Sequence, residues 1–530
     1  MKRNKSYAFI NVLGLAVGIA ACLLLFLVIQ FETSFDNFHS KKNNIYRVVS
    51  AFQSPEGTDY SAGVPFPTAD ALRIDYPQIK EVAAIYGTTD QQITIPAKEN
   101  EPPKKFKEAT GVFFSEPQFF NLFDFKLLAG NIKTALTDPN TVLLTKETAE
   151  KYFGDWKSVI GKTITLNNKY LLKVTGILDD IPSNTDFPLK VVISYPTLKS
   201  TSMSSQLTDW VSVSSGANCY VLFPSNYSVA QFDASLKSFV KKHVPPEYQK
   251  DGLTIQSLSE IHFDDRIGNF SSKTFSKELI TALSLIGIFL LIIACVNFIN
   301  LATAQAVNRA KEVGIRKVMG SNRKQLLLQF MGETGLITLC SIIVAVIIAA
   351  LSIPVLNNML IIKLSLNLFQ TPQLIIFLVA VFAFVTLFSG LYPALILSGY
   401  NPINALKSKV TVKTMGGVSL RRGLVVLQFV IAQVLIIGTL VVVTQTNYFR
   451  NADLGFNKEA IITVPLPGDS LSSLKLDVFR NQLVQQPGIE NVSFSFASPA
   501  DNSGWYSDFK YDNAAKNADF DASFKLADTA

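Results

Sequence analysis

The sequence is poor in the residues that build redox, metal and hydrolytic sites. Its 530 residues include 4 cysteines and 3 histidines, and His39, His243 and His262 lie far apart without a cysteine or histidine at metal-ligand spacing. Cys219 is the only cysteine outside the strongly apolar segments, so the large polar region around it cannot form an internal disulfide. The sequence gives no indication of a catalytic, cofactor-binding or metal site.

Charged residues are also scarce, at 17% of the chain against about a quarter in soluble domains. The deficit comes from five apolar blocks, each close to the roughly 20 residues that cross a bilayer as a helix. They cover residues 8–29, 279–302, 335–356, 374–395 and 424–444. The first block is longer than the apolar part of a signal peptide and continues through Cys22, so we predict an uncleaved anchor rather than a secretion or lipoprotein signal.

The chain has a net charge of +7, and its basic residues are distributed as in a membrane protein rather than as in a nucleic-acid-binding protein. Basic residues cluster before the first block, between the second and third, and between the fourth and fifth. Loops rich in Lys and Arg stay in the cytosol. Residues 1–30 are therefore predicted to hold a cytosolic start and the first span. The loops 303–334 and 396–423 are predicted to be cytosolic, and 31–278, 357–373 and 445–530 to lie outside. We expect contact with membrane lipid and none with nucleic acid.

The outer region 31–278 is long enough for one or two folded domains, and its mixture of strand-like and helix-like runs predicts an α+β fold. A β-hairpin is predicted around Asn167 and Asn168. A short helix is predicted between a Thr145 cap and a terminating Gly154. The aromatic residues between 119 and 125 are expected to pack in the core. The fold class is thus an α-helical membrane protein with an α+β extracytoplasmic domain inserted between spans one and two.

The cytosolic stretch 303–334 is the most informative part of the chain. Between 308 and 324 it carries six basic residues and one acid, too much charge for the lipid interior. Gly320 suits a helix C-terminus, and Asn322 with Gln325 suits a capping box. We therefore predict two helices, one over 304–319 along the membrane surface and a second that begins near Arg323 and enters the third span.

A glycine-lysine-threonine triplet at Gly161 imitates the end of a phosphate-binding loop. A phosphate-binding loop also needs a glycine five positions before Gly161, and the residue at that position is Trp156. We therefore expect no ATP hydrolysis by this chain and place that activity in a partner subunit.

The block at 424–444, with its basic start, repeats the pattern of the N-terminus. Residues 445–530 then follow as a partial second outer domain without a returning span. This pattern predicts a two-repeat protein in a C-terminally truncated form.

Three regions resemble the MacB/FtsX-type permeases of ABC transporters, in the long two-repeat form of Bacteroidetes-like bacteria. They are the basic segment 309–321, the glycine-tyrosine-proline segment 390–394 with Pro402 and Leu406, and the outer-domain segments 119–130, 146–154, 160–164 and 174–182. These motifs are specific when taken together. The resemblance covers most of residues 1–450 and weakens after 470.

The resemblance implies a bacterial inner-membrane permease whose outer domain is MacB-like and periplasmic. A separate cytosolic ABC ATPase would drive it, and MacB-like members also work with a periplasmic adaptor and an outer-membrane channel. By position, the surface facing the ATPase would consist of Lys311, Glu312, Val313, Gly314, Ile315, Arg316, Lys317 and Met319. The alternative role for these basic residues is topology and lipid contact alone.

Three functions remain open at this stage. The first is export of a substrate or mechanotransmission, driven by the ATPase. The second is an FtsX-like regulator or sensor that controls a cell-wall hydrolase or signalling partner without substrate passage. The third, a membrane enzyme acting through its outer domain, needs a cluster of catalytic groups that the sequence does not contain.

Overall fold

The structure, a computed structural model, describes residues 5–55, 57–96, 102–368, 371–399, 418–453, 461–466 and 474–498, with short stretches at 504–507, 509, 512 and 522–528. The chain divides into two compact units. One unit comprises residues 1–33 and 277–453, and the other comprises 34–276 and 454–530.

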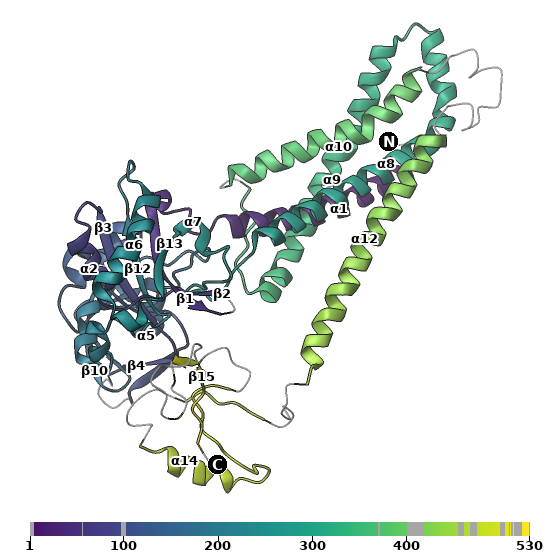
Figure 1. The fold of residues 1–530 in the computed structure, drawn as a ribbon. Coiled ribbons are helices and arrows are strands. Elements are labelled where there is room, and N and C mark those ends of the chain that lie inside the picture. Colours follow the sequence, from purple (N-terminus) through teal and green to yellow (C-terminus); the bar gives the residue numbers. More distant parts are fainter. Residues whose placement is uncertain are drawn as a thin grey trace. The chain divides into compact units, whose positions relative to one another are not determined.

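Long helices make up the first unit (Figure 1). They are α1 (Lys5–Thr33), α8 (Lys277–Val318), α9 (Arg323–Leu360), α10 (Pro372–Gly399) and α12 (Val418–Asn451). In the described residues, these five helices are long and apolar enough to cross a membrane, in agreement with the five predicted spans. Four of them pack around a common apolar cluster that includes Leu15 on α1, Phe298 on α8, Ala345 on α9 and Val385 on α10. Most apolar side chains of α12, by contrast, are exposed, although Ile431 is buried.

Small residues set the spacing between the helices of this unit. A Cβ placed on Gly18 of α1 would lie 2.6 Å from Cβ of Ala294 on α8. A Cβ on Gly390 of α10 would lie 3.2 Å from Cβ of Thr334 on α9. Glycine at these two positions lets the helix backbones approach closely, as small residues do between membrane helices.

Helix α8 departs from the sequence-based expectation. A separate surface helix over 304–319 was predicted, but the structure has one unbroken helix from Lys277 to Val318. The span and the basic segment are both helix-forming, and no glycine or proline separates them, so nothing interrupts the backbone hydrogen bonds. At 1.5 Å per residue its 42 residues extend about 63 Å, roughly twice the hydrocarbon thickness of a bilayer.

The second unit contains a mixed sheet of 13 strands. Its main path runs β13 (Gly252–Ser257), β1 (Ile45–Ser54), β12 (Ala217–Leu222), β3 (Glu81–Thr88), β6 (Val112–Ser115), β11 (Val191–Ser194), β8 (Thr141–Thr145), β10 (Tyr170–Leu178), β9 (Thr163–Leu166), β4 (Gln91–Ile95) and β5 (Lys104–Glu108). Two further strands lie off this path, β2 (Gly57–Ser61) beside β1 and β7 (Leu127–Gly130) beside β10. Strand pairs β8–β10 and β6–β11 are parallel, and the other pairs are antiparallel.

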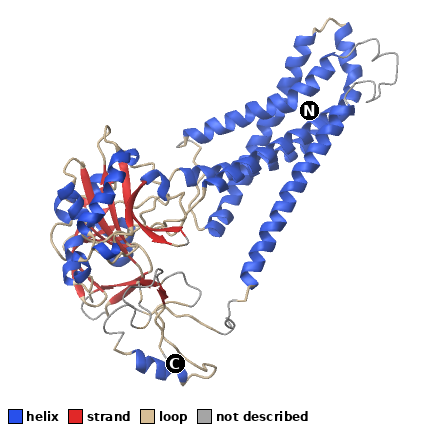
Figure 2. Cartoon of the chain, viewed as in Figure 1, coloured by secondary structure: helices blue, strands red, loops and turns tan. Residues whose placement is uncertain are grey.

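Short helices accompany the sheet, as Figure 2 shows. They are α2 (Thr68–Asp75), α3 (Phe119–Leu122), α4 (Ile132–Ala135), α5 (Lys146–Phe153), α6 (Val229–His243) and α7 (Leu258–Ile261). The combination confirms the predicted α+β class of this domain.

Local predictions for this domain also hold. Strands β9 and β10 form the expected hairpin, and Asn167 and Asn168 in its turn both have positive φ, a conformation that asparagine adopts more readily than most residues. Thr145 accepts a hydrogen bond from the Thr148 amide at the start of α5, and Gly154 ends that helix with φ of +84°. The expected aromatic core is present, with Phe119 and Phe123 buried against Phe187 and Tyr220.

Two carboxylates inside this domain are held by cations. Glu108 accepts hydrogen bonds from Lys151, from Lys190 at 3.1 Å and from the Tyr152 hydroxyl at 3.0 Å. Burial opposes ionisation of Glu108, but these bonds outweigh it and the pKa of Glu108 is lowered.

The second carboxylate belongs to Glu116, which pairs with Arg73 of α2 and accepts the Ala84 amide at 2.7 Å. Arg73 also bonds the exposed Asp70 at 2.6 Å. The buried Glu108 and the partly buried Glu116 thus attach α5 and α2 to the strands beneath them.

The C-terminal residues are described in part. Helix α14 (Leu476–Val484) and an antiparallel pair, β14 (Trp505–Ser507) with β15 (Ala522–Phe524), belong to this region. The partial second domain over 445–530 stays a prediction. Most of the predicted linker 396–423, including Pro402 and Leu406, lies outside the described residues.

Candidate functional site

Helices α8 and α9 form a hairpin whose turn is fixed by backbone bonds at the end of α8. The Gly320 amide donates to the Lys317 carbonyl at 3.1 Å, and the Ser321 amide donates to the Arg316 carbonyl at 3.0 Å. Gly320 has φ of +97°, in the left-handed region that this paired arrangement requires. The predicted end of the helix at Gly320 is therefore confirmed.

The start of α9 is fixed as firmly. The Asn322 side chain accepts the Gln325 amide at 2.9 Å, and the Gln325 side chain accepts the Asn322 amide at 3.1 Å. This reciprocal pair is the capping box that the sequence predicts. With both helix ends satisfied, residues 312–326, here called the hairpin tip, form a defined surface rather than a loose loop.

One face of the hairpin tip turns toward the protein. Val313 is 3% exposed and packs with Leu326, Phe330 and Leu397, and Gly314 is buried as well. Sequence reasoning proposed Val313 as an apolar anchor for a partner. The structure instead uses its side chain to hold α8, α9 and α10 together.

A polar row crosses from α8 to α9. Arg316 donates to Glu312 at 2.7 Å one turn earlier and to Gln329 of α9 at 2.7 Å. Gln329 in turn donates to Glu333 at 3.3 Å. Gln329 was not predicted to belong to the site, although its position one turn from Gln325 and Glu333 on α9 is a signal that could have found it. Arg316 thus braces the hairpin and leaves only part of its guanidinium to solvent.

The opposite face of the hairpin tip is apolar and exposed. Ile315, Val318 and Met319 are 49%, 67% and 74% exposed, and their spacing of three and four residues places them on one side of α8. Arg323 and Lys324 are exposed at the start of α9. This face, here called the apolar stripe, therefore has a basic border.

The remaining predicted residues lie beside the stripe. Glu312 is exposed, and Lys317 is half-buried, where burial and the neighbouring Arg323 lower the pKa of its ammonium group. Lys311 belongs to α8, but its side chain lies outside the described residues. The structure thus divides the predicted set into an outward part and an inward part.

A small pocket of about 40 Å³ lies behind the hairpin tip, between α8, α9 and α10. Glu333 and Gln305 line it together with apolar residues, among them Phe298 and Pro393. Its volume suits only a few water molecules. Across the described residues, no three His, Cys, Asp or Glu side chains are grouped so that they could hold a metal ion.

Comparison with known families gives two matches along the chain. Residues 8–239 match the MacB-like periplasmic core domain, and residues 284–402 match the FtsX-like permease C-terminal region. The first match contains α1 and most of the α+β domain, and the second contains the hairpin tip.

Two curated relatives that the chain matches share one name. The macrolide export ATP-binding/permease protein MacB of Pasteurella multocida is 22% identical over 66% of this chain and 50% of its own length. The protein of that name from Bdellovibrio bacteriovorus is 26% identical over 36% of this chain and 28% of its own length. The chain spans half or less of the length of these relatives.

Two solved structures match the α+β domain. A domain of a putative permease from Porphyromonas gingivalis aligns with a TM-score of 0.36 and 18% identity, over 46% of this chain and 98% of that one. The periplasmic region of MacB from Actinobacillus actinomycetemcomitans aligns with a TM-score of 0.30 and 15% identity, over 42% of this chain and 91% of that one.

Proposed function

The chain belongs to the MacB/FtsX-type permeases of ABC transporters, and from this premise we propose that a separate cytosolic ATPase binds its hairpin tip and drives its periplasmic domain. The work done on the periplasmic side is export of a substrate or transmission of movement to a partner. In this proposal the N-terminus and the hairpin tip lie in the cytosol, since loops rich in Lys and Arg favour that side of the membrane. A periplasmic adaptor and an outer-membrane channel are the further partners of an export system.

The apolar stripe is the observation that carries this proposal. Ile315, Val318 and Met319 are exposed at the end of α8 that carries the basic residues, and the turn beside them is fixed by the bonds at Gly320 and by the capping box of α9. An apolar centre with a charged border is the usual composition of a protein interface. Basic residues such as Arg323 then set the orientation and the rate of association.

Helix α8 also offers a route for the movement. It runs without interruption from Lys277 to the hairpin tip, so a displacement of the tip is carried along one rigid element. A continuous helix transmits a push better than a surface helix joined by a flexible link. This supports coupling between the tip and residues 31–278, whichever output the protein has.

The test is co-purification in detergent of the full chain with an ATPase from its own host. We expect an ABC-type ATPase to be captured, and we expect a variant carrying Ile315→Asp and Met319→Asp to bind at least about thirtyfold more weakly, since two central apolar anchors are lost. Leu171→Asp is the control, because it places the same charge at a 58% exposed leucine of the periplasmic domain.

Unchanged capture by the double variant refutes docking at the stripe. Lys324→Glu tests the basic border at an exposed residue, whereas reversal of Arg316 would also break the bonds to Glu312 and Gln329. If the wild-type chain captures the ATPase but deletion of its gene causes no export defect, the output is mechanotransmission without substrate passage.

A further inference from the structure

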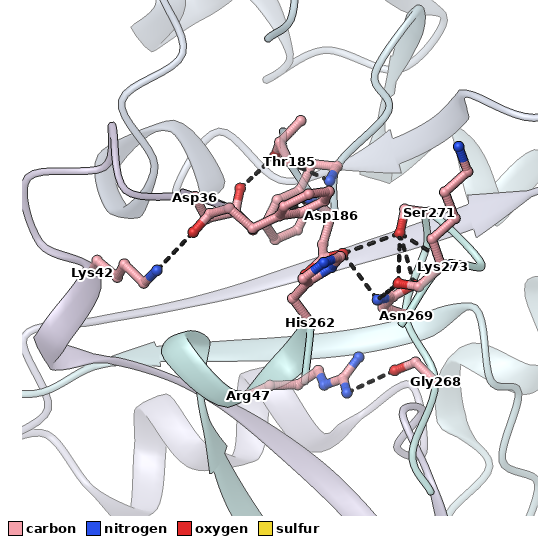
Figure 3. Close-up of polar contacts among 12 residues, drawn as sticks. Asp36, Lys42, Arg47, Thr185, Asp186, His262, Gly268, Asn269, Ser271 and Lys273 are labelled. Atoms are coloured by element: carbon pink, nitrogen blue, oxygen red, sulfur yellow. Dashed lines mark hydrogen bonds and ion pairs between the residues drawn. The ribbon is translucent and has the colours of Figure 1, made fainter. Parts of the chain in front are cut away.

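Two connectors join the spanning helices to the α+β domain. The first connector, residues 34–42, follows α1 directly, and the second, residues 262–276, precedes α8. Both contact residues 184–186, here called the clip, in the segment between β10 and β11 (Figure 3). Segments more than 200 residues apart in the sequence are thus fastened to one tripeptide of the domain.

The first connector is held through Asp36. Its amide donates to the Asn184 carbonyl at 3.0 Å, and its carboxylate accepts the Thr185 hydroxyl and, at 3.2 Å, the Asp186 amide. The Asn184 side chain also donates to the Ser34 hydroxyl at 2.9 Å. Asp36 is 1% exposed and has φ of +54°, a left-handed conformation that is uncommon for residues with a side chain, although aspartate adopts it more often than most.

The second connector is held through Asp186. One carboxylate oxygen accepts the Asn269 side chain at 2.9 Å, the Ser271 hydroxyl at 3.0 Å and the His262 ring at 3.4 Å. Asn269 also donates to the Lys273 carbonyl at 2.7 Å, so the connector is folded around the same group. Figure 3 shows these bonds converging on Asp186.

The two connectors also touch each other. The His262 ring stacks on Phe35, with centroids 3.4 Å apart and planes 11° from parallel. Arg47 of strand β1 donates to the Gly268 carbonyl at 2.9 Å, and Lys42 donates to the Phe35 carbonyl at 2.6 Å. The sheet, the clip and both connectors therefore share one contact network.

Burying the charged side chains of this network costs free energy. Asp186 and Arg47 are buried, and burial raises the pKa of Asp186 and lowers the pKa of Arg47. Apolar side chains of similar size would pack here without that cost. Directional hydrogen bonds, unlike apolar contacts, resist sliding of one segment over another, which is the property that a mechanical joint needs.

We propose that the clip locks the two connectors together, so that movements of α1 and α8 reach the sheet as one displacement. This inference rests on the proposed function for its purpose but not for its test. The locking itself is a property of the permease alone. It makes Asp186 a positioning residue for coupling rather than a member of any binding surface.

Hydrogen exchange of the full chain in detergent tests the lock without an ATPase. In Asp186→Ala, the amides of 262–276 and of 34–42 are expected to exchange together, about tenfold faster or more, while strands β8 and β10 keep their protection. Asp138→Ala is the matched control, since this exposed aspartate lies in the same domain and its loss should change neither connector. If Asp186→Ala does not fold, the double variant Asn269→Ala with Ser271→Ala, which removes two of the groups that donate to Asp186, is read in the same way.

Loss of protection in 262–276 alone, or in neither connector, overturns the lock. A second arm adds ATP and the co-purified ATPase, and compares exchange in the sheet with and without nucleotide. We expect Asp186→Ala to bind the ATPase as the wild type does and to leave the ATPase's hydrolysis of ATP unchanged, but to lose the nucleotide-dependent change in the sheet. If the wild type captures no ATPase, the proposed function fails while the first arm still decides the lock. If the sheet of Asp186→Ala responds like the wild type, coupling through the clip is refuted.

Discussion

Replacing Gly320 by alanine should loosen the hairpin tip by an amount that can be worked out from its geometry. A Cβ on this residue would meet no atom within 4 Å, so crowding contributes nothing. The backbone alone resists the change, because φ is +97° and a residue with a side chain disfavours the left-handed region by about 1–2 kcal/mol. The bonds that close α8 at Lys317 and Arg316 should weaken by the same amount.

Hydrogen exchange measured by mass spectrometry on the full chain in detergent reports this free-energy penalty as faster exchange of the amides near Gly320. A penalty of about 1–2 kcal/mol corresponds to roughly 5–30-fold faster exchange of peptides that span 314–326. The amides of residues 320 and 321, which donate to those two carbonyls, should account for much of the change.

Gly332→Ala supplies the matched control. Gly332 lies within α9, its added Cβ would also meet nothing within 4 Å, and its φ is not positive. Alanine is favoured over glycine inside a helix by about 1 kcal/mol, so exchange near 332 should stay equal or become slower. Equal exchange in Gly320→Ala and the wild type, or equal acceleration in both variants, would show that the tip is not fixed by the turn at Gly320.

Three further results are expected. Arg73→Ala should destabilise the periplasmic domain by about 1–3 kcal/mol in thermal unfolding, because it removes the cation that donates to Glu116, whose side chain is only 14% exposed, whereas Asp70→Ala, at an 81% exposed side chain, should cost less than about 1 kcal/mol. Glu108→Gln should lower the unfolding temperature at pH 7, and the difference from the wild type should shrink as pH falls below about 4.5, since a carboxylate with a lowered pKa stabilises the fold only while it is ionised. A gap that stays constant down to pH 3 would contradict that assignment. Gly18→Val should separate α1 from α8 and lower the unfolding temperature of the full chain in detergent, while Gly14→Val, at a position where a Cβ meets no atom within 4 Å, should leave it unchanged.

The features that the sequence predicted well are those set by local chemistry. The capping box at Asn322, the left-handed turn at Gly320 and the Asn167–Asn168 hairpin depend on side chains within a few residues of each other. The number of spans follows from composition, and the aromatic core follows from the density of phenylalanine between 119 and 125.

The features that it missed depend on contacts between distant segments. Val313 was expected to face a partner, but its burial is decided by Leu326 and by Leu397, which lies more than 80 residues away. The contacts of the clip could not be predicted for the same reason, because Asp186 lies beside residues near 36 and near 270 only in the folded domain. The continuity of α8 was not predicted, because the change from apolar to charged residues near 303 suggested the start of a new helix. A helix continues wherever its backbone hydrogen bonds are uninterrupted, whatever the polarity of its side chains.

Strand β5 ends the sheet of the periplasmic domain, and its composition bears on how the protein behaves at high concentration. A free edge strand can recruit a strand from another molecule and begin aggregation. Strand β5 carries Lys104, Lys105 and Lys107 within five residues, and all three side chains are exposed. Repulsion between such edges should discourage edge-to-edge association, so the domain can be crowded at a membrane surface without self-assembling through this strand.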